Sequence, residues 1–327
     1  MTQRPVERRR PAVALTVAGT DSGGGAGVAA DLRTFAACRV WGTVAVTAVT
    51  AQNSLGVQRV EHLAPEVVRA QIDSVVDDIG VDAVKTGMLG TAGVVHAVAE
   101  VLRNRAVAPL VVDPVVESSS GHRLLDPEGL AVLRQELLPL ATVVTPNLAE
   151  AALLAGWEPV GTEGPRGAGV AGGRERIEAL ARAVLALGPG AVLLTGGHLA
   201  EAGSPDCLVA RGEETRWLEG ERVPTADTHG TGCVLSAALT ARLAVGDALP
   251  EACRAAKAVV GRALRASVAL GSGPGSVDPL VFQRTAFWIL PARLQDVQTC
   301  MRRGAPFIRA RTRWMLGFQR RLMRRWE

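Results

Sequence analysis

The chain has 327 residues, 48% of them hydrophobic and only 3% aromatic, so its core must be built from Ala, Val and Leu. Its five cysteines form no C-x-x-C pair, which argues against a disulfide framework or a zinc knuckle and favours a reducing cytoplasm. The net charge of +4 arises after residue 283; residues 1–283 carry 25 basic and 30 acidic side chains, which argues against nucleic-acid binding.

Strand and helix patterns alternate along the chain. Apolar β-branched runs predict strands at 12–19, 42–52, 82–89, 108–115, 142–147 and 190–197. Amphipathic patterns rich in Ala and Leu predict helices at 27–38, 65–79, 92–104, 127–137, 147–155, 173–187, 231–245 and 249–270. Two short runs within 206–219 predict a small antiparallel pair. The alternation predicts βαβ units and a parallel sheet with helices on both faces, an α/β fold of three layers.

We predict three parts: an N-terminal extension over 1–11, one α/β domain over 12–283, and an Arg- and Trp-rich extension over 284–327 of open role. The apolar run after Arg10 is short and ends in Thr20-Asp21-Ser22, so we interpret it as the first strand and not as a signal peptide. No segment predicts a membrane span. The C-terminal extension could be an unstructured basic tail, a helix that binds a partner or a membrane surface, or an artefact of the gene's 3′ end.

Glycine-rich or polar segments follow nearly every predicted strand: "GTDSGGGAG", "TAQNSLG", "KTGML", "DPV", "TPNLAE", "TGGH" and "THGTGC". Ligands of open α/β sheets bind at the carboxyl ends of the strands, so we expect the site there. "GAGVAA" from Gly25 fits the dinucleotide fingerprint, but the second strand ends without the acidic residue that binds a ribose. Neither lysine, Lys85 or Lys257, follows a glycine, which excludes a P-loop.

The segment "THGTGC" predicts a phosphate site. Gly230 and Gly232 let backbone N–H groups face an anion, and the helix that starts there adds a partial positive charge. Cys233 would stand beside the phosphate at the helix N-terminus, where we expect a lowered thiol pKa. It could then accept the proton of an attacking hydroxyl.

"TPNLAEA" permits two interpretations. Asn147 and Glu150 are three residues apart at a helix start, so they share one face of the helix. The carboxylate could hold Mg²⁺ directly or through water. Equally, the two side chains could only cap the helix.

Seven motifs taken in order resemble the hydroxymethylpyrimidine/phosphomethylpyrimidine kinases of thiamine biosynthesis, in the ribokinase superfamily: "LTVAGTDSGGGAGVAADLRTF", "TAVTAQNSLGV", "VKTGMLG", "VVDPV", "TPNLAEA", "GGH" and "THGTGCVLSAAL". The resemblance spans roughly Ala12–Leu280. It implies a ribokinase-like three-layer α/β/α sandwich with a mostly parallel central sheet. It also implies ATP with Mg²⁺, and two successive phosphorylations, of 4-amino-5-hydroxymethyl-2-methylpyrimidine and then of its monophosphate.

The resemblance also implies site residues. Gln52 would read the pyrimidine, since a carboxamide offers both a donor and an acceptor. The rest of that pocket would be Gly19, Asp21, Ala26, Met88 and Val115. The anion hole and base would be Gly230, Thr231, Gly232 and Cys233, ATP would meet Asn147, Thr195 and Gly197, and Mg²⁺ would meet Glu150 and Asp113.

Two departures from the family concern positive charge. Thr195 and Ser119 stand where many relatives have lysines near the triphosphate, and a neutral hydroxyl donates a weaker hydrogen bond to phosphate. We expect these changes to affect the rate. A pyridoxine/pyridoxal kinase of the same superfamily and a catalytically weak, ligand-binding regulator stay open as alternatives. The family also implies a homodimer.

Overall fold

The computed structural model describes residues 10–107, 109–118, 121–157, 173–196 and 203–281. The chain divides into two units after Leu280, and the description concerns the first unit. Most of the predicted N-terminal extension and the whole segment 284–327 lie outside the described residues, so the division into three parts stays a prediction. Within the described parts, no helix has both the length and the apolar character that crossing a membrane requires.

An eight-stranded sheet with the order β10-β9-β8-β7-β6-β5-β1-β2 forms the centre of the unit. Its strands are β1 Val13–Ala18, β2 Trp41–Val46, β5 Ala83–Thr86, β6 Leu110–Val112, β7 Val143–Val144, β8 Ala191–Leu194, β9 Asp206–Ala210 and β10 Arg216–Leu218. Within this sheet β2, β1, β5, β6, β7 and β8 run parallel to one another, whereas β9 and β10 are antiparallel to their neighbours. The predicted mostly parallel sheet is confirmed, and the predicted antiparallel pair forms its edge.

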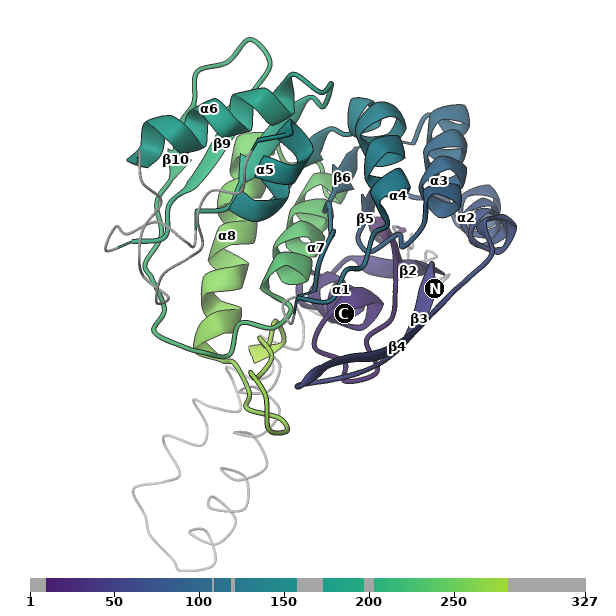
Figure 1. Ribbon diagram of the computed structural model, residues 1–327, viewed down its shortest axis with the longest axis horizontal. Helices are drawn as coiled ribbons and strands as arrows, with labels where there is room; N and C mark the ends of the chain where they lie inside the picture. Colours follow the sequence, from purple (N-terminus) through teal and green to yellow (C-terminus); the bar gives the residue numbers. More distant parts are fainter. Residues whose placement is uncertain (1–9, 108, 119–120, 158–172, 197–202, 282–327) are drawn as a thin grey trace, which may run out of the picture. The chain divides into compact units, whose positions relative to one another are not determined.

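Helices cover both faces of this sheet (Figure 1). One face carries α1 Gly27–Ala37, α7 Thr231–Ala244 and α8 Leu249–Arg265. The other carries α2 Pro65–Asp78, α3 Ala92–Arg105, α4 Pro127–Val132, α5 Leu148–Ala155 and α6 Gly173–Leu185. Strand residues alternate between the two layers: Leu110 and Val112 join the core under α3, while Val111 joins the core under α7. Since both faces are covered, the strands read as continuous apolar runs.

Several predicted elements differ from the structure in extent or in type, and the strand predicted over 142–147 is reduced to Val143–Val144. The single strand expected over 42–52 is two strands, because the chain leaves the sheet after β2 and continues as β3 Ala48–Asn53. β3 pairs with β4 Gly56–His62 in a separate antiparallel hairpin, and β4 was not predicted. The helix expected over 127–137 changes to a π-helical turn at Leu133–Leu137, and α8 ends at Arg265 instead of residue 270.

A charged pair lies inside the sandwich. The Lys85 ammonium on β5 donates to Asp31 Oδ1 on α1 at 2.8 Å, and Thr16 donates to Asp31 Oδ2 at 2.6 Å. Both charged side chains are fully buried. Burial alone would lower the pKa of Lys85, but the carboxylates of Asp31 and Asp113 raise it above its usual range, so the ammonium stays charged.

Breaking this pair should destabilise the fold strongly. Lys85→Met leaves the Asp31 carboxylate buried without its counter-charge, so we expect a loss of about 3–5 kcal/mol in the free energy of unfolding by urea. The double variant Lys85→Met/Asp31→Asn should recover much of that loss. Arg69→Met is the control, since it breaks the partly exposed Arg69–Glu100 pair and should cost about 1 kcal/mol or less. Equal losses of unfolding free energy for Lys85→Met and Arg69→Met would show that the buried Lys85–Asp31 pair matters no more to stability than a surface pair.

Candidate active site

The predicted polar strand ends meet at one edge of the sheet. Backbone hydrogen bonds join neighbouring strand ends: Gly87 N to Val17 O at 3.0 Å, Asp113 N to Thr86 O at 3.0 Å, and Thr145 N to Val112 O at 3.0 Å. Thr195 N reaches Pro146 O at 3.0 Å in the same way. The segments after β1, β5, β6, β7 and β8 therefore form one continuous rim, as parallel strands require.

Gly230–Cys233, here called the phosphate cradle, begins α7. Gly230 caps the helix with φ of +84°, and a Cβ on it would lie 1.9 Å from Gly25 O. Only glycine fits there. Gly232 differs, since it is exposed and its nearest neighbour for an added Cβ is Asp113 Oδ2 at 4.0 Å. The fold therefore requires Gly230, whereas the open space at Gly232 is available to a ligand. Thr231 lies between them and donates to Thr228 O at 2.6 Å.

The expected low pKa of Cys233 is wrong. The residue retains some solvent exposure, but burial of its thiol raises the pKa to about 12. Lys85 and the backbone of Gly27 favour the thiolate, and the carboxylates of Asp31 and Asp113 oppose it. Cys233 is therefore a neutral thiol near pH 7 in the unliganded protein.

Two acidic side chains lie near the cradle. Asp113 follows β6, is buried, and accepts a hydrogen bond from Ser236 Oγ of α7 at 2.9 Å. Glu150 lies in the first turn of α5, where burial first and repulsion by Asp113 second raise its pKa to about 8. Asn147 Oδ1 accepts from Glu150 N at 2.9 Å and Glu150 Oε2 accepts from Asn147 N at 3.0 Å, so the capping box is present.

The capping box does not exclude a cation. Among the described residues no group of three or more His, Cys, Asp or Glu side chains gathers as a metal site. Mg²⁺, however, usually takes only one or two carboxylates besides waters and substrate phosphates. Two buried carboxyls that repel one another would be stabilised by such an ion. Asp113 and Glu150 therefore fit Mg²⁺ held together with a nucleotide.

The residues expected to bind the pyrimidine come from three segments of the rim and from β3. Gly19 and Met88 touch, since a Cβ on Gly19 would lie 3.0 Å from Met88 Sδ. Ala26 is the residue before α1, and Val115 follows β6. Gln52 stands at a bulge in the β3–β4 hairpin, a place where strands commonly re-aim a side chain. No described residue hydrogen-bonds its carboxamide, which leaves that group available to a ligand.

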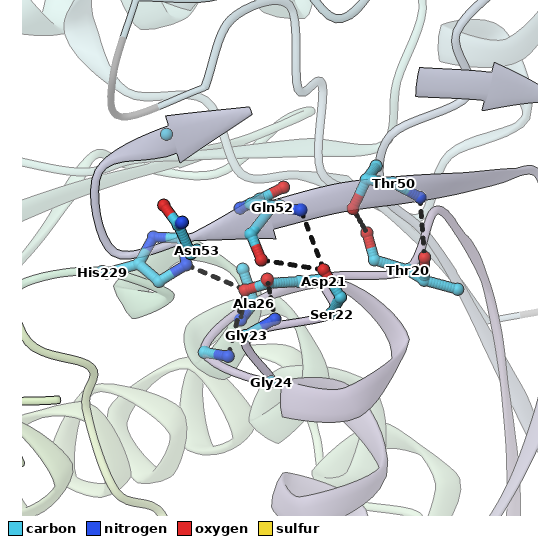
Figure 2. Close-up of polar contacts among 12 residues, drawn as sticks. Thr20, Asp21, Ser22, Gly23, Gly24, Ala26, Thr50, Gln52, Asn53 and His229 are labelled. Carbon is cyan, nitrogen blue, oxygen red and sulfur yellow. Dashed lines mark hydrogen bonds and ion pairs between the residues drawn. The ribbon is translucent and has the colours of Figure 1, made fainter. Parts of the chain in front are cut away.

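Asp21 is engaged inside the protein. Its Oδ1 accepts from Gly23 N at 2.8 Å, and its Oδ2 accepts from Gly25 N at 3.0 Å and Ala26 N at 2.8 Å. Nε2 of His229 lies 2.9 Å from the same Oδ2 (Figure 2). Burial raises the pKa of Asp21, but these hydrogen bonds and the His229 charge lower it by more. His229 was not among the predicted site residues, although it stands in "THGTGC", because nothing in its local sequence names its partner.

The remaining predictions fall on the rim near β8. Thr195 is partly buried at the end of β8, and the next residue, Gly196, donates its N–H to Asp206 Oδ1 at 3.0 Å. Lys257 of α8 donates to Asp206 Oδ2 at 2.7 Å, so an ion pair supports this segment. Gly197 and Ser119 lie outside the described residues.

Known proteins are similar to this chain in sequence and in fold. A model of the family described as phosphomethylpyrimidine kinase matches residues 21–278. The hydroxymethylpyrimidine/phosphomethylpyrimidine kinase of Streptomyces coelicolor is 49% identical over 268 residues, which cover 82% of this chain and 94% of that protein. The structure of Bacillus subtilis pyridoxal kinase with ADP is 36% identical, with a TM-score of 0.74 over 84% of this chain and 99% of that one. Phosphomethylpyrimidine kinase of Clostridium difficile is also 36% identical, with a TM-score of 0.64 over 76% and 97%. The ribokinase-like fold is thereby confirmed.

The two cradle glycines should respond differently to alanine. Gly230→Ala forces a side chain into a left-handed backbone against Gly25, so we expect a loss of about 1–3 kcal/mol in stability. The free energy of unfolding of Gly232→Ala should lie within about 0.5 kcal/mol of the wild-type value. This variant should nevertheless bind nucleotide more weakly, as measured by calorimetry. Gly261→Ala in α8 is the control, where the added Cβ meets Arg265 at 3.6 Å and binding should not change. Unchanged nucleotide affinity in Gly232→Ala would remove this glycine from the site.

Proposed function

The chain belongs to the phosphomethylpyrimidine kinase family, and from that premise we propose that it transfers phosphoryl groups from ATP to 4-amino-5-hydroxymethyl-2-methylpyrimidine and then to its monophosphate, in thiamine biosynthesis. One observation of the structure supports this most directly. The phosphate cradle, at the N-terminus of a fourteen-residue helix, lies in backbone contact with the loop Gly19–Ala26 that adjoins Gln52. The proposed phosphate site and the proposed acceptor site are thus neighbours.

The phosphate end is supported by backbone groups. The N–H of Thr231 donates to Thr228 O at 3.2 Å. The other N–H groups of the first turn of α7 lack partners within the helix and would face a bound anion, with the helix dipole behind them. Asn147 and Thr195 would contact ATP from the rim, while Asp113 and Glu150 would hold Mg²⁺. The cation would neutralise charge on the transferring phosphoryl group. The oxygen of the acceptor hydroxyl attacks the γ-phosphorus, and the bond between that phosphorus and the oxygen that leaves with ADP breaks. The hydroxyl proton passes to a base.

Cys233 would accept that proton, and only its thiolate can do so. Phosphoryl transfer passes through a loose transition state in most analyses, so the proton leaves late and positioning supplies most of the catalysis. The buried Lys85 ammonium favours the thiolate at that moment. We therefore propose that the thiol first loses its own proton to solvent in a small fraction of the molecules, and that this thiolate accepts the hydroxyl proton late in the transfer.

A pH profile tests this role for Cys233. Because its thiol pKa in the unliganded protein is about 12, the thiolate fraction rises tenfold per pH unit below that value. The kcat of the wild type should therefore increase with pH through the neutral and alkaline range. Cys233→Asp should retain turnover with its rise moved to lower pH, and Cys233→Ala should lose about 10²-fold in kcat while still binding nucleotide. Wild-type turnover in Cys233→Ala would show that the cysteine only packs.

Recognition of the pyrimidine is assigned to Gln52. Its carboxamide can donate to a ring nitrogen and accept from the exocyclic amine, which an aliphatic side chain cannot do. The neighbouring walls would be Gly19, Ala26, Met88 and Val115.

Substitution of Gln52 separates the two substrates. Gln52→Leu leaves polar groups of the pyrimidine unpaired, at a cost of about 1–3 kcal/mol, so KM for the pyrimidine should rise about 5- to 150-fold. KM for ATP should stay nearly constant. Gln58→Leu on the exposed face of the same hairpin is the matched control and should change neither. Equal pyrimidine KM values for wild type and Gln52→Leu would refute the assignment.

A pyridoxine/pyridoxal kinase is the second candidate, favoured by the likeness to Bacillus subtilis pyridoxal kinase. A ligand-binding regulator with weak turnover is the third, motivated by Thr195 and Ser119 in place of lysines. A panel of the pyrimidine alcohol, its monophosphate, pyridoxal and pyridoxine with MgATP distinguishes them. The main proposal expects the highest kcat/KM with the two pyrimidines. Turnover of pyridoxal alone would favour the pyridoxal kinase instead, and turnover of none of the four compounds would favour the regulator.

We further propose a cytoplasmic homodimer built on the α/β domain 12–283. The cytoplasmic location rests on the absence of C-x-x-C pairs in the sequence, and the dimer on the family resemblance. Light scattering of the purified chain measures the oligomeric state directly.

A further inference from the structure

We propose that Asp21 and His229 are positioning residues that hold the acceptor loop, Gly19–Ala26, at a fixed distance from the phosphate cradle. The inference rests on the proposed kinase function and extends it, since it assigns a role to a contact between residues 208 positions apart. Neither side chain need touch a substrate for this role.

The Asp21 carboxylate is fully used within the protein. Three backbone N–H groups of its own loop and the His229 ring surround its two oxygens at 2.8–3.0 Å. Its side chain is only 2% exposed and that of His229 16%. These contacts shape the loop and join it to the residue before Gly230. A carboxylate so engaged suits a structural tie better than a ligand contact.

The other side of the acceptor loop is joined to β3. Ser22 Oγ donates to Gln52 O and accepts from Gln52 N, both at 2.8 Å. Thr50 N donates to Thr20 Oγ1 at 3.0 Å, and Thr50 Oγ1 donates to Thr20 O at 2.9 Å. Figure 2 shows these contacts on one side of the loop and His229 beyond Asp21. One short loop therefore connects the strand that carries Gln52 to the cradle.

His229 itself is fixed by a third segment. Its N–H donates to Gly275 O at 3.2 Å, and its carbonyl accepts from Val277 N at 3.1 Å. The backbone at Gly230 is thus held independently of Asp21. Removing the imidazole should leave the cradle in place and free the acceptor loop to move away from it.

The contact between the two loops leaves no room for adjustment. A Cβ on Gly25 would lie 2.2 Å from Ser276 Oγ and 2.4 Å from His229 Cδ2. With the imidazole present, the loops pack backbone to backbone. In-line transfer needs reacting atoms about 3–3.5 Å apart, and a misplacement of about 1 Å can cost about 10²-fold in rate. The tie between Asp21 and His229 therefore acts on kcat through geometry.

The test compares His229→Ala and His229→Gln with wild type, using the pyrimidine alcohol and MgATP. We expect His229→Ala to lose about 10²-fold in kcat, with KM for ATP changed less than about threefold. The number of ADP molecules formed per phosphorylated pyrimidine should rise above one, because water then attacks the γ-phosphorus in place of the displaced hydroxyl and gives ADP, phosphate and a proton. His229→Gln, whose amide N–H can reach Asp21, should restore both values in part.

The ADP-to-product ratio does not depend on how much enzyme is folded, so an unstable variant still gives an answer. His96→Ala is the control, since His96 pairs with Glu136 on the surface and should leave rate and ratio unchanged. A wild-type ratio and kcat in His229→Ala would overturn the inference, as would failure of His229→Gln to recover either value. An inactive wild type would instead refute the proposed function, so the two failures are distinguishable.

Discussion

A single buried ammonium, that of Lys85, balances the acidic groups beneath the carboxyl edge of the sheet. Its direct partner is Asp31 at 2.8 Å, and its charge also acts on Asp113 and Cys233. A buried charge persists in a protein only when it is paired, so this ammonium and these acidic groups depend on one another. The arrangement explains why a fully buried central strand carries a lysine, and it places a positive charge under the phosphate cradle without exposing it to the ligand.

The distribution of positive charge has a further consequence for phosphate binding. The chain has only two lysines, and the structure uses both internally: Lys85 with Asp31, and Lys257 with Asp206. Neither Lys85 nor Lys257 makes up for the two lysines that many relatives have at the positions of Thr195 and Ser119. Under the proposed function, the triphosphate would rely more heavily on the N–H groups of α7 and on a bound cation. Backbone donors are fixed by the fold, so precise placement of the cradle matters more here than it would beside mobile cationic side chains.

Periodicity predicted the three-layer fold and the rim, because buried parallel strands leave long apolar runs and must end at one edge. Periodicity did not predict features that are set by contacts between residues distant in the sequence. β4 is largely polar and pairs only with β3, so its pattern carries no burial signal. The pKa of Cys233 was predicted from the adjacent helix alone, while burial, Asp31 and Asp113 set it from distant parts of the chain. His229 went unassigned for the same reason, since its partner Asp21 precedes it by 208 residues.

The base role proposed for Cys233 can be weighed against the acidic groups around it. Burial first, and repulsion by Asp113 second, already raise the pKa of Glu150 to about 8. A carboxylate at position 233 would be a ready base but would add a third negative charge near the incoming triphosphate. A thiol is neutral while ATP binds, and it must lose its own proton to solvent before the thiolate can accept the hydroxyl proton. Cysteine thus gives up a base that is already ionised in return for weaker repulsion, which suits a reaction that depends chiefly on positioning.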